Sequence, residues 1–282
     1  MSTTMERRAG ARMKRKGTSA ARPVDLQRHR RQRRNSVLLA LLGWVLFLGA
    51  WEIAAGTGIV DYSFSSKPSA FSSSLFDLMQ GRELWSDIYD TTGTMLIGFL
   101  ISLAVGVPAG LLFSWSRVAD RMTSSIVSAL YALPFVAFVP LVILWFGITD
   151  TARIALISWS AVFPVLINTS GGVRNLNRQF LRVAEAYCAP QRRMLTTVVF
   201  PATLPYILTG MRLAIGRALV AAVVAEFFMA SSGLGYFINQ SAATFNMNNA
   251  FAGLVVIGFL GVLLVQLTSM LERRFSSWTS AG

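Results

Sequence analysis

Six long apolar segments constrain the fold of this chain more than any other feature of its sequence. An α-helix rises about 1.5 Å per residue, so about 20 apolar residues cross the roughly 30 Å hydrocarbon core of a bilayer. The apolar segments cover residues 37–55, 91–113, 126–146, 152–168, 207–228 and 251–271. They predict an all-α membrane protein with about six transmembrane helices.

The length and pattern of the same segments argue against a β-barrel. Each segment is far longer than a tilted barrel strand of roughly 9–11 residues, and none alternates strictly between polar and apolar residues. The composition agrees, because 54% of the 282 residues are hydrophobic and only 14% are charged. Gly106, Pro108, Gly110, Pro134 and Pro140 interrupt the segments. Such breaks are tolerated where neighbouring helices or a cavity satisfy the backbone, so they indicate a packed bundle with a pathway.

The basic residues predict the orientation of the chain. Twelve of the 26 Lys and Arg residues precede the first segment, and most of the others fall in loops on the same side. The loops expected on the opposite side hold only Lys67 and Arg82, while Arg153, Arg212 and Arg217 lie within or at the ends of segments. Because cytoplasmic loops are enriched in basic residues, we expect both termini in the cytoplasm. Arg212 and Arg217 are expected near the inner interface, where they would reach toward lipid phosphates.

The chain is expected to divide into four parts. Residues 1–35 read as a disordered, basic cytoplasmic tail that is attracted to anionic lipids, because they carry much of the net charge of +13 and show no periodic apolar face. Without an aromatic residue for stacking on bases, the tail does not indicate nucleic-acid binding. Residues 36–89 hold the first transmembrane helix and an outside loop, and residues 90–272 hold the main transmembrane domain. Residues 273–282 form a cytoplasmic C-terminal tail.

Two features of the N-terminal third leave alternatives open. A cleaved secretory signal would place its cleavage end among Trp44, Trp51 and Glu52, and five further segments follow, which favours an uncleaved helix. The outside loop can contain a short amphipathic helix with Phe71, Leu75, Leu78 and Met79 on one side. That helix would contact a soluble partner or lie on the membrane surface.

The chain lacks the residues of an enzyme site. Its one histidine, His29, lies in the basic tail, so a His-based triad or a His metal site cannot be built. The one cysteine, Cys188, permits neither an intramolecular disulfide nor a zinc cluster. No GxxxxGK[ST] phosphate loop is present. We therefore expect a non-catalytic chain without a cofactor or metal of its own, so any ATP would be bound by a partner subunit.

Residues 171–205 are a polar, basic and amphipathic insert between two apolar segments, which suggests a grip on a soluble partner. Ala184, Tyr187, Met194 and Leu195 can form an apolar side, with basic residues beside it. Pro201 and Pro205 are expected to stop the helix of the insert, because proline cannot continue a helix interior.

The following motifs resemble the permease subunits of binding-protein-dependent ABC importers, of the nitrate, sulfonate and taurine type. They cover roughly residues 90–272 and comprise Leu133-Pro134, Pro140-Leu141, 144–147, 163–169, Gly172-Val173, 184–205, Gly210, Arg212, Leu213, 216–218, 224–226 and 232–236. The resemblance implies a MetI-like permease fold in a multi-pass protein of the bacterial inner membrane. It also implies a homodimer or a pair with a similar permease, ABC ATPase subunits inside and an extracytoplasmic solute-binding protein outside.

The same resemblance makes the insert a coupling loop for the ATPase. Its candidate residues are Arg182, Ala184, Glu185, Ala186, Tyr187, Cys188, Ala189, Pro190, Arg192 and Arg193. The family's glycine aligns with Cys188 and its first glutamate with Arg182, while Pro190 interrupts a stretch that is otherwise unbroken in the family.

Four side chains within the spans are candidates for the path or for a gate. They are Phe135, Phe138, Asn168 and Glu226, and Glu226 is singled out because an ionisable group is costly in a bilayer. The two Phe rings can equally be packing residues, and Glu226 can equally be structural. The resemblance suggests a small anionic substrate, such as a sulfonate, taurine, nitrate or an aromatic carboxylate. A secondary transporter or channel without an ATPase, and a scaffold without transport, remain as alternatives.

Overall fold

The computed structural model describes residues 23–58 and 64–276, and every regular element in these ranges is helical, which confirms the all-α prediction. The expected tail residues 1–22 and 277–282 lie outside the described ranges. The helices are α1 (Pro23–Gly56), α2 (Pro68–Gln80), α3 (Glu83–Trp115), α4 (Arg117–Ala132), α5 (Val139–Phe146), α6 (Asp150–Arg174), α7 (Arg178–Ala186), α8 (Gln191–Met194), α9 (Phe200–Met229), α10 (Leu234–Ala243) and α11 (Met247–Ser276). A 3-10 turn, η2 (Phe135–Phe138), precedes α5, and a π-turn, η3 (Leu195–Val199), precedes α9.

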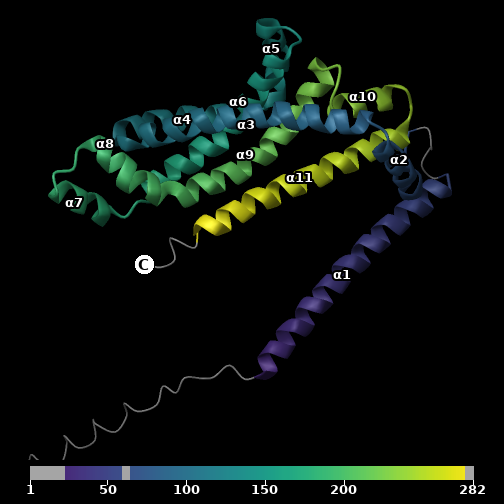
Figure 1. Cartoon of the computed structure of the whole chain (residues 1–282), viewed down its shortest axis with the longest axis horizontal. Coiled ribbons are helices and arrows are strands. Elements are labelled where there is room, and N and C mark those ends of the chain that lie inside the picture. The colour runs from purple at the N-terminus through teal and green to yellow at the C-terminus, as the bar shows by residue number, and fades with distance from the viewer. Residues whose placement is uncertain (1–22, 59–63, 277–282) are drawn as a thin grey trace, which may run out of the picture.

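Helix α6 is the centre of the bundle, because it packs along both α3 and α9 (Figure 1). Met95 of α3, Ile157 of α6 and Ala218 of α9 belong to one buried apolar cluster. Helix α11 covers α9, whereas α1 diverges from the bundle and meets it only near its C-terminal end, beside α2 (Figure 1). The core therefore rests on three helices, and the first span is peripheral.

Small residues on α3 let its backbone approach α6 closely. A Cβ atom on Gly98 would lie 2.6 Å from the side chain of Ile157, and one on Gly110 would lie 2.7 Å from that of Thr169. Between them, Gly106 faces Val165 in the same way. Ser158 and Ser170 of α6 donate hydrogen bonds to the carbonyl oxygens of Gly98 and Gly110, at 3.2 Å and 3.3 Å. Gly106 and Gly110 therefore form a GxxxG pair at the contact between α3 and α6, as small residues favour close packing in membranes.

The third span is broken, and not a continuous helix over residues 126–146 as the apolar pattern predicts. Helix α4 ends at Ala132, and the chain turns through 86° before α5. Pro134 causes the break, because proline disfavours helical dihedrals in the preceding residue, and Leu133 is extended with ψ of 136°. With this bent pair counted as one span, the described residues hold six candidate spans, and without it five.

The bent pair connects opposite ends of the bundle. Trp115, at the end of α3, lines the same cleft as Arg174 at the end of α6, so α4 starts at this end. Asp90 near the start of α3 pairs with Arg153 at the start of α6, so α5 leads to the other end. We call the first the α7 end, since α7 follows α6 there, and the second the Glu226 end. The α4–α5 pair thus crosses the bundle once.

Two further expectations change. Helix α1 begins at Pro23, so it includes residues 23–35, which the sequence predicts to be part of a disordered tail. This helix can form because Arg, Gln and Leu are good helix formers and proline fits a first helical turn.

Pro201 and Pro205 do not stop a helix. Pro201 lies in the first turn of α9, Pro205 lies inside α9, and the apolar helical run continues from Gln191 to Met229. In the outside loop, α2 is the expected short helix, and Phe71 packs against Trp51 and Phe251.

Candidate functional site

A buried ionic network joins three helices at the Glu226 end. Glu226, near the end of α9, is 1% exposed, and Arg153 of α6 is 4% exposed. The Arg153 guanidinium lies 3.1 Å from Asp90 of α3 and 3.9 Å from Glu226 Oε1, and it also pairs with Asp150. One cation therefore faces three carboxylates, which ties the ends of α3, α6 and α9 together.

The loop before α10 wraps around the Glu226 carboxylate. The backbone N–H of Gly235 donates to Glu226 Oε2 at 2.7 Å, and the Thr91 hydroxyl donates to the same oxygen at 3.1 Å. Thr91 in turn accepts the backbone N–H of Leu234 at 2.9 Å. A Cβ atom on Gly233, whose φ is +102°, would lie 2.6 Å from the Glu226 carboxylate, so this turn requires glycine.

The same loop is fixed to the start of α3. Ser232 donates its hydroxyl to Asp90 at 2.8 Å, and the backbone N–H of Gly233 donates to Asp87 at 2.8 Å. Glu226 Oε1 is buried and accepts no hydrogen bond in the described part of the chain, so only the Arg153 charge stabilises it there. Because an unsatisfied buried oxygen is costly, this contact is sensitive to small movements of the three helices.

The insert after α6 protrudes at the opposite end. Helix α7 contacts the bundle chiefly through η3 (Figure 1). It ends in a Schellman motif, in which the backbone N–H of Ala189 donates to the carbonyl oxygen of Ala184 at 3.1 Å. Cys188 occupies the left-handed position of this motif with φ of +50°, a conformation that glycine adopts without strain. The glycine that the resemblance implies at this position would fit the turn without strain, and Pro190 follows as the residue before α8.

Several side chains of α7, of its cap and of α8 are exposed. Tyr187 is 82% exposed and Val183 is 57% exposed, and Arg182, Arg192 and Arg193 are exposed as well. None of these three arginines has an acidic partner in the part of the chain that the structure describes. Met194 is buried, so it does not belong to the apolar docking side that the sequence suggests. The remaining candidates are placed as follows: Ala184, Glu185 and Ala186 in α7, Ala189 in the turn after it.

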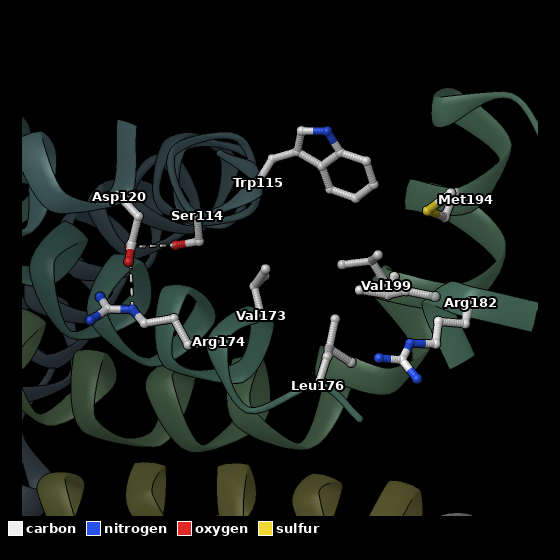
Figure 2. Close-up of a pocket in the computed structure, with 10 residues that line it drawn as sticks. Ser114, Trp115, Asp120, Val173, Arg174, Leu176, Arg182, Met194 and Val199 are labelled. Carbon is white, nitrogen blue, oxygen red and sulfur yellow. Dashed lines mark hydrogen bonds and ion pairs between the residues drawn. The ribbon is translucent and has the colours of Figure 1, made fainter. Parts of the chain in front are cut away.

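A cleft of about 520 Å³ separates α7 and α8 from the ends of α3 and α6 (Figure 2). Trp115, Val173 and Leu176 line it on the bundle side, and Arg182 faces it from α7 (Figure 2). Arg174 pairs with Asp120 at 3.2 Å along its wall. The cleft leaves α7 loosely attached, with space to move relative to the helices that it follows.

The other three candidate path residues lie outside the Glu226 network. Phe138 stacks on Trp159, with ring centroids 5.4 Å apart, and Phe135 packs against both buried apolar clusters. Asn168 is half-buried in α6 and donates to the carbonyl oxygen of Pro164 at 2.8 Å. The structure brings none of these three into the Glu226 network.

Comparison with known proteins identifies the family. Residues 102–279 match the model of the "Binding-protein-dependent transport system inner membrane component". The chain belongs to this family. It is a multi-pass inner-membrane permease of an ABC transporter.

Curated relatives cover most of the permease. The chain is 30% identical over 250 residues to the "Putative aliphatic sulfonates transport permease protein SsuC" of Bacillus subtilis (strain 168), covering 89% of this chain and 91% of the relative. It is 31% identical over 272 residues to the "Bicarbonate transport system permease protein CmpB" of Synechococcus elongatus, covering 90% and 95%. It is 28% identical over 237 residues to the "Formylaminopyrimidine transport permease protein ThiX" of Halalkalibacterium halodurans, covering 84% and 94%.

The solved structures agree on the fold of the permease. An inward-facing structure of the MetNI methionine ABC transporter matches with a TM-score of 0.61 at 17% identity, covering 68% of this chain and 96% of that chain. At this identity the match shows the fold alone. It confirms the predicted MetI-like architecture.

Sequence reasoning found Glu226 but missed its partners. Asp90, Thr91 and Arg153 lie at helix starts, where polar residues are common, so each alone gives little signal. A useful signal was available in the motif of residues 232–236, since its two glycines require a closely approaching neighbour, and that neighbour is Glu226.

Proposed function

We propose that this chain is the path-forming subunit of an ABC importer for small anions, and that α7 docks a separate ATPase. The observation that carries the proposal is the exposed surface of α7, its cap and α8, where Val183 and Tyr187 present apolar area and three arginines lack an acidic partner in the described chain. An apolar anchor with a charged rim is typical of a protein interface. Family membership supports an ATPase and a solute-binding protein as partners.

The proposed orientation places the α7 end in the cytoplasm and the Glu226 end outside. The exposed arginines of the α7 end support this orientation, because basic residues accumulate on the cytoplasmic side. In this arrangement the solute-binding protein meets the Glu226 end, and the chain acts as a homodimer with the path between its copies. The basic N-terminal tail would contact anionic lipids of the inner leaflet.

The substrate class rests on the relatives and on charge. Two relatives are named for aliphatic sulfonates and bicarbonate, which are both small oxyanions, while a third is named for formylaminopyrimidine. Residues 91–115, 154–173 and 200–225, which make up most of three spans, hold Arg212 and Arg217 but no Asp or Glu. We therefore favour a small oxyanion.

Reconstituted transport tests this function. The chain, its ATPase and its binding protein are placed in proteoliposomes, and uptake of an alkanesulfonate or bicarbonate is measured with ATP or with an ion gradient alone. We expect ATP-dependent uptake, and we expect Val183→Ala combined with Tyr187→Ala to abolish it. Truncation of two interface anchors at about 1–2 kcal/mol each lowers affinity for the ATPase by roughly 30-fold or more.

The matched control is Val45→Ala, a similarly exposed valine on α1, the helix that diverges from the bundle. It should leave ATPase recruitment and uptake unchanged. Uptake driven by an ion gradient without ATP would favour a secondary transporter instead. Normal ATPase recruitment by the double variant would rule out docking through α7.

A further inference from the structure

Arg217 lies halfway between the two ends of the bundle. The close contact of Gly172 with Tyr206 marks the packing of α6 on α9 at the α7 end, and the Arg153–Glu226 pair marks it at the other end. At about 1.5 Å per residue, Arg217 is roughly 17 Å from Tyr206 and roughly 14 Å from Glu226 along the axis. Its side chain is too short to reach polar surroundings at either end.

Within the described residues, Arg217 has no counter-charge. Arg212, one and a half turns earlier on the same helix, pairs with Glu272 of α11 at 2.9 Å. Arg217 makes no ion pair, and its described contact is with the Tyr131 ring of α4, 4.7 Å from its centroid. Residues 91–115, 154–173 and 200–225 contain no Asp or Glu at all. The middle of the bundle therefore carries an uncompensated positive charge.

A charge of this kind does not face lipid. Arginine at the centre of a bilayer costs at least about 2.5 kcal/mol, and such residues almost always face a bundle interior or a water-filled cavity. The stripe of α9 that holds Arg217 also holds the exposed Leu213 and Val220, so the described chain covers this face only in part, through Tyr131. The face must therefore border water or a second copy of the chain.

Helix α4 supports the aqueous alternative. Its stripe of Val118, Met122 and Ile126 is apolar and exposed, as a lipid-facing surface requires. At 100° per residue, Tyr131 lies about 140° around the helix from Ile126, on a side that also carries Ser124 and Ser128. Tyr131 thus places the polar side of α4 beside Arg217, and a polar stripe opposite an apolar one is typical of a helix that lines a path.

Aromatic rings extend from this point toward the Glu226 end. Tyr131 contacts Phe163, Phe163 contacts Trp159 and Trp159 contacts Phe138, with ring centroids 6.2, 5.1 and 5.4 Å apart. Because Trp159 precedes Phe163 by one turn of α6, the series rises toward Arg153. A solute that enters at the Glu226 end would pass these rings before it meets Arg217.

We propose that Arg217, stacked on Tyr131, is an anion-binding station at the midpoint of the path, and that it takes small oxyanions such as sulfonates and bicarbonate. The planar guanidinium offers donors in a fixed fork that matches a sulfonate or carboxylate. Its full donor capacity is free, since no described residue accepts from it. This inference rests on the proposed function for the identity of the solute. The presence of water and the preference for anions can be tested without transport.

Thiol labelling measures both properties directly. Cys188→Gly removes the one native cysteine at a position that suits glycine, and Val220→Cys then places a thiol three residues from Arg217 on the same stripe. The full-length protein, assembled with its ATPase in membrane vesicles, is treated with the anionic 2-sulfonatoethyl or the cationic 2-(trimethylammonio)ethyl methanethiosulfonate. We expect both reagents to label Cys at 220, with the anionic reagent favoured.

The same ratio is then measured after Arg217→Gln and after Arg217→Lys. Removal of one charge about 7 Å from the thiol should lower the anionic-to-cationic rate ratio by about sevenfold, even at the dielectric constant of water. The lysine variant should keep the ratio within about twofold of the parent. Phe259→Cys, on the exposed side of α11, is the lipid-facing control and should react with neither reagent.

Two results would overturn the proposal that Arg217 is an anion-binding station. Failure of both reagents to reach position 220 would show that the face is packed or lipid-covered, and an unchanged ratio after Arg217→Gln would show that the arginine does not attract anions. Uptake of ethanesulfonate in proteoliposomes adds an independent arm, in which Arg217→Gln should raise the KM several-fold while Arg212→Gln leaves it unchanged. If the wild type transports nothing with ATP, the proposed function fails, whereas the labelling still decides on Arg217.

Discussion

Glu226 occupies a site that no neutral residue of the chain could fill in the same way. One of its oxygens accepts hydrogen bonds from Gly235 and Thr91, and the other faces the Arg153 guanidinium. Removing one partner of a buried pair leaves an uncompensated charge, which costs about 3–5 kcal/mol. Glutamine can keep the first set of contacts, but its NH2 group then replaces the oxygen that faces Arg153, and the charge attraction is lost.

We therefore predict that Glu226→Gln folds and assembles normally but lowers ATP-driven uptake by roughly tenfold, equivalent to about 1.4 kcal/mol. The reason is that the attraction between α6 and α9 at the Glu226 end contributes to the balance between the two states of the transporter. Uptake in proteoliposomes and the melting temperature in detergent are measured together. Glu52→Gln, outside the network, is the control, and wild-type uptake by Glu226→Gln would contradict the prediction.

For single residues, the sequence predicted which side chains matter better than it predicted the contacts that they make. Glu226 stands out as the one acidic residue within the fifth apolar segment, and the resemblance implied a glycine where Cys188 stands. The sequence does not show how a residue other than glycine fits there, because this depends on the backbone dihedral angle φ of Cys188. Arg217 was expected near the membrane interface, and only the packing of α9 on α6 places it at half height.

Among the elements, the contact between α3 and α6 depends most on small side chains. A Cβ on Gly106 would lie 3.0 Å from the Val165 side chain and 3.1 Å from the Val162 carbonyl oxygen. A larger group there would separate the two helices over several turns. Gly93 on the same helix has no neighbour within 4 Å and offers a matched control.

We predict that Gly106→Leu destabilises the protein by about 2–3 kcal/mol, as overpacking of a tight interface does, while Gly93→Leu stays within about 0.5 kcal/mol. Thermal unfolding in detergent measures the difference. Equal melting temperatures for the two variants would mean that the α3–α6 contact yields easily, contrary to the close packing described.

The prolines show why element boundaries were harder to predict than elements. The sequence predicted a helix in the outside loop and the spans of α3, α6, α9 and α11, because each has a long apolar pattern. It treated Pro201 as a stop, although a proline in the first turn of a helix loses no hydrogen bond. It treated residues 126–146 as continuous, although Pro134 turns the chain sharply. The local effect of each proline depended on where the helix began, which the apolar pattern did not fix.

For the whole molecule, the bent α4–α5 pair determines whether the number of membrane crossings is even or odd. Because it begins at the α7 end and finishes at the Glu226 end, it adds a crossing to those of the long helices. With α1 counted, the chain crosses six times, and an even number returns the C-terminus to the side of the N-terminus. A re-entrant pair would place the termini on opposite sides.

We predict that a green fluorescent protein fused after Gly282 is fluorescent and that alkaline phosphatase at the same place is inactive, since both report a cytoplasmic C-terminus. Phosphatase fused within the loop after α1 should be active. An active phosphatase at the C-terminus would contradict six crossings and would require the α4–α5 pair to return to the side where it started.

The uninterrupted helical run from Gln191 to Met229 links the two ends of the molecule in one piece. Its 39 residues span roughly 58 Å at about 1.5 Å per residue. If it pivots near its middle, a tilt of only about 5° displaces each tip by about 2.5 Å, which is close to the full length of the bond between Gly235 and Glu226. If α7 docks an ATPase as we propose, a rotation too small to disturb the core would suffice to release the loop at the Glu226 end, and a movement of the ATPase would then set the time at which a solute is released.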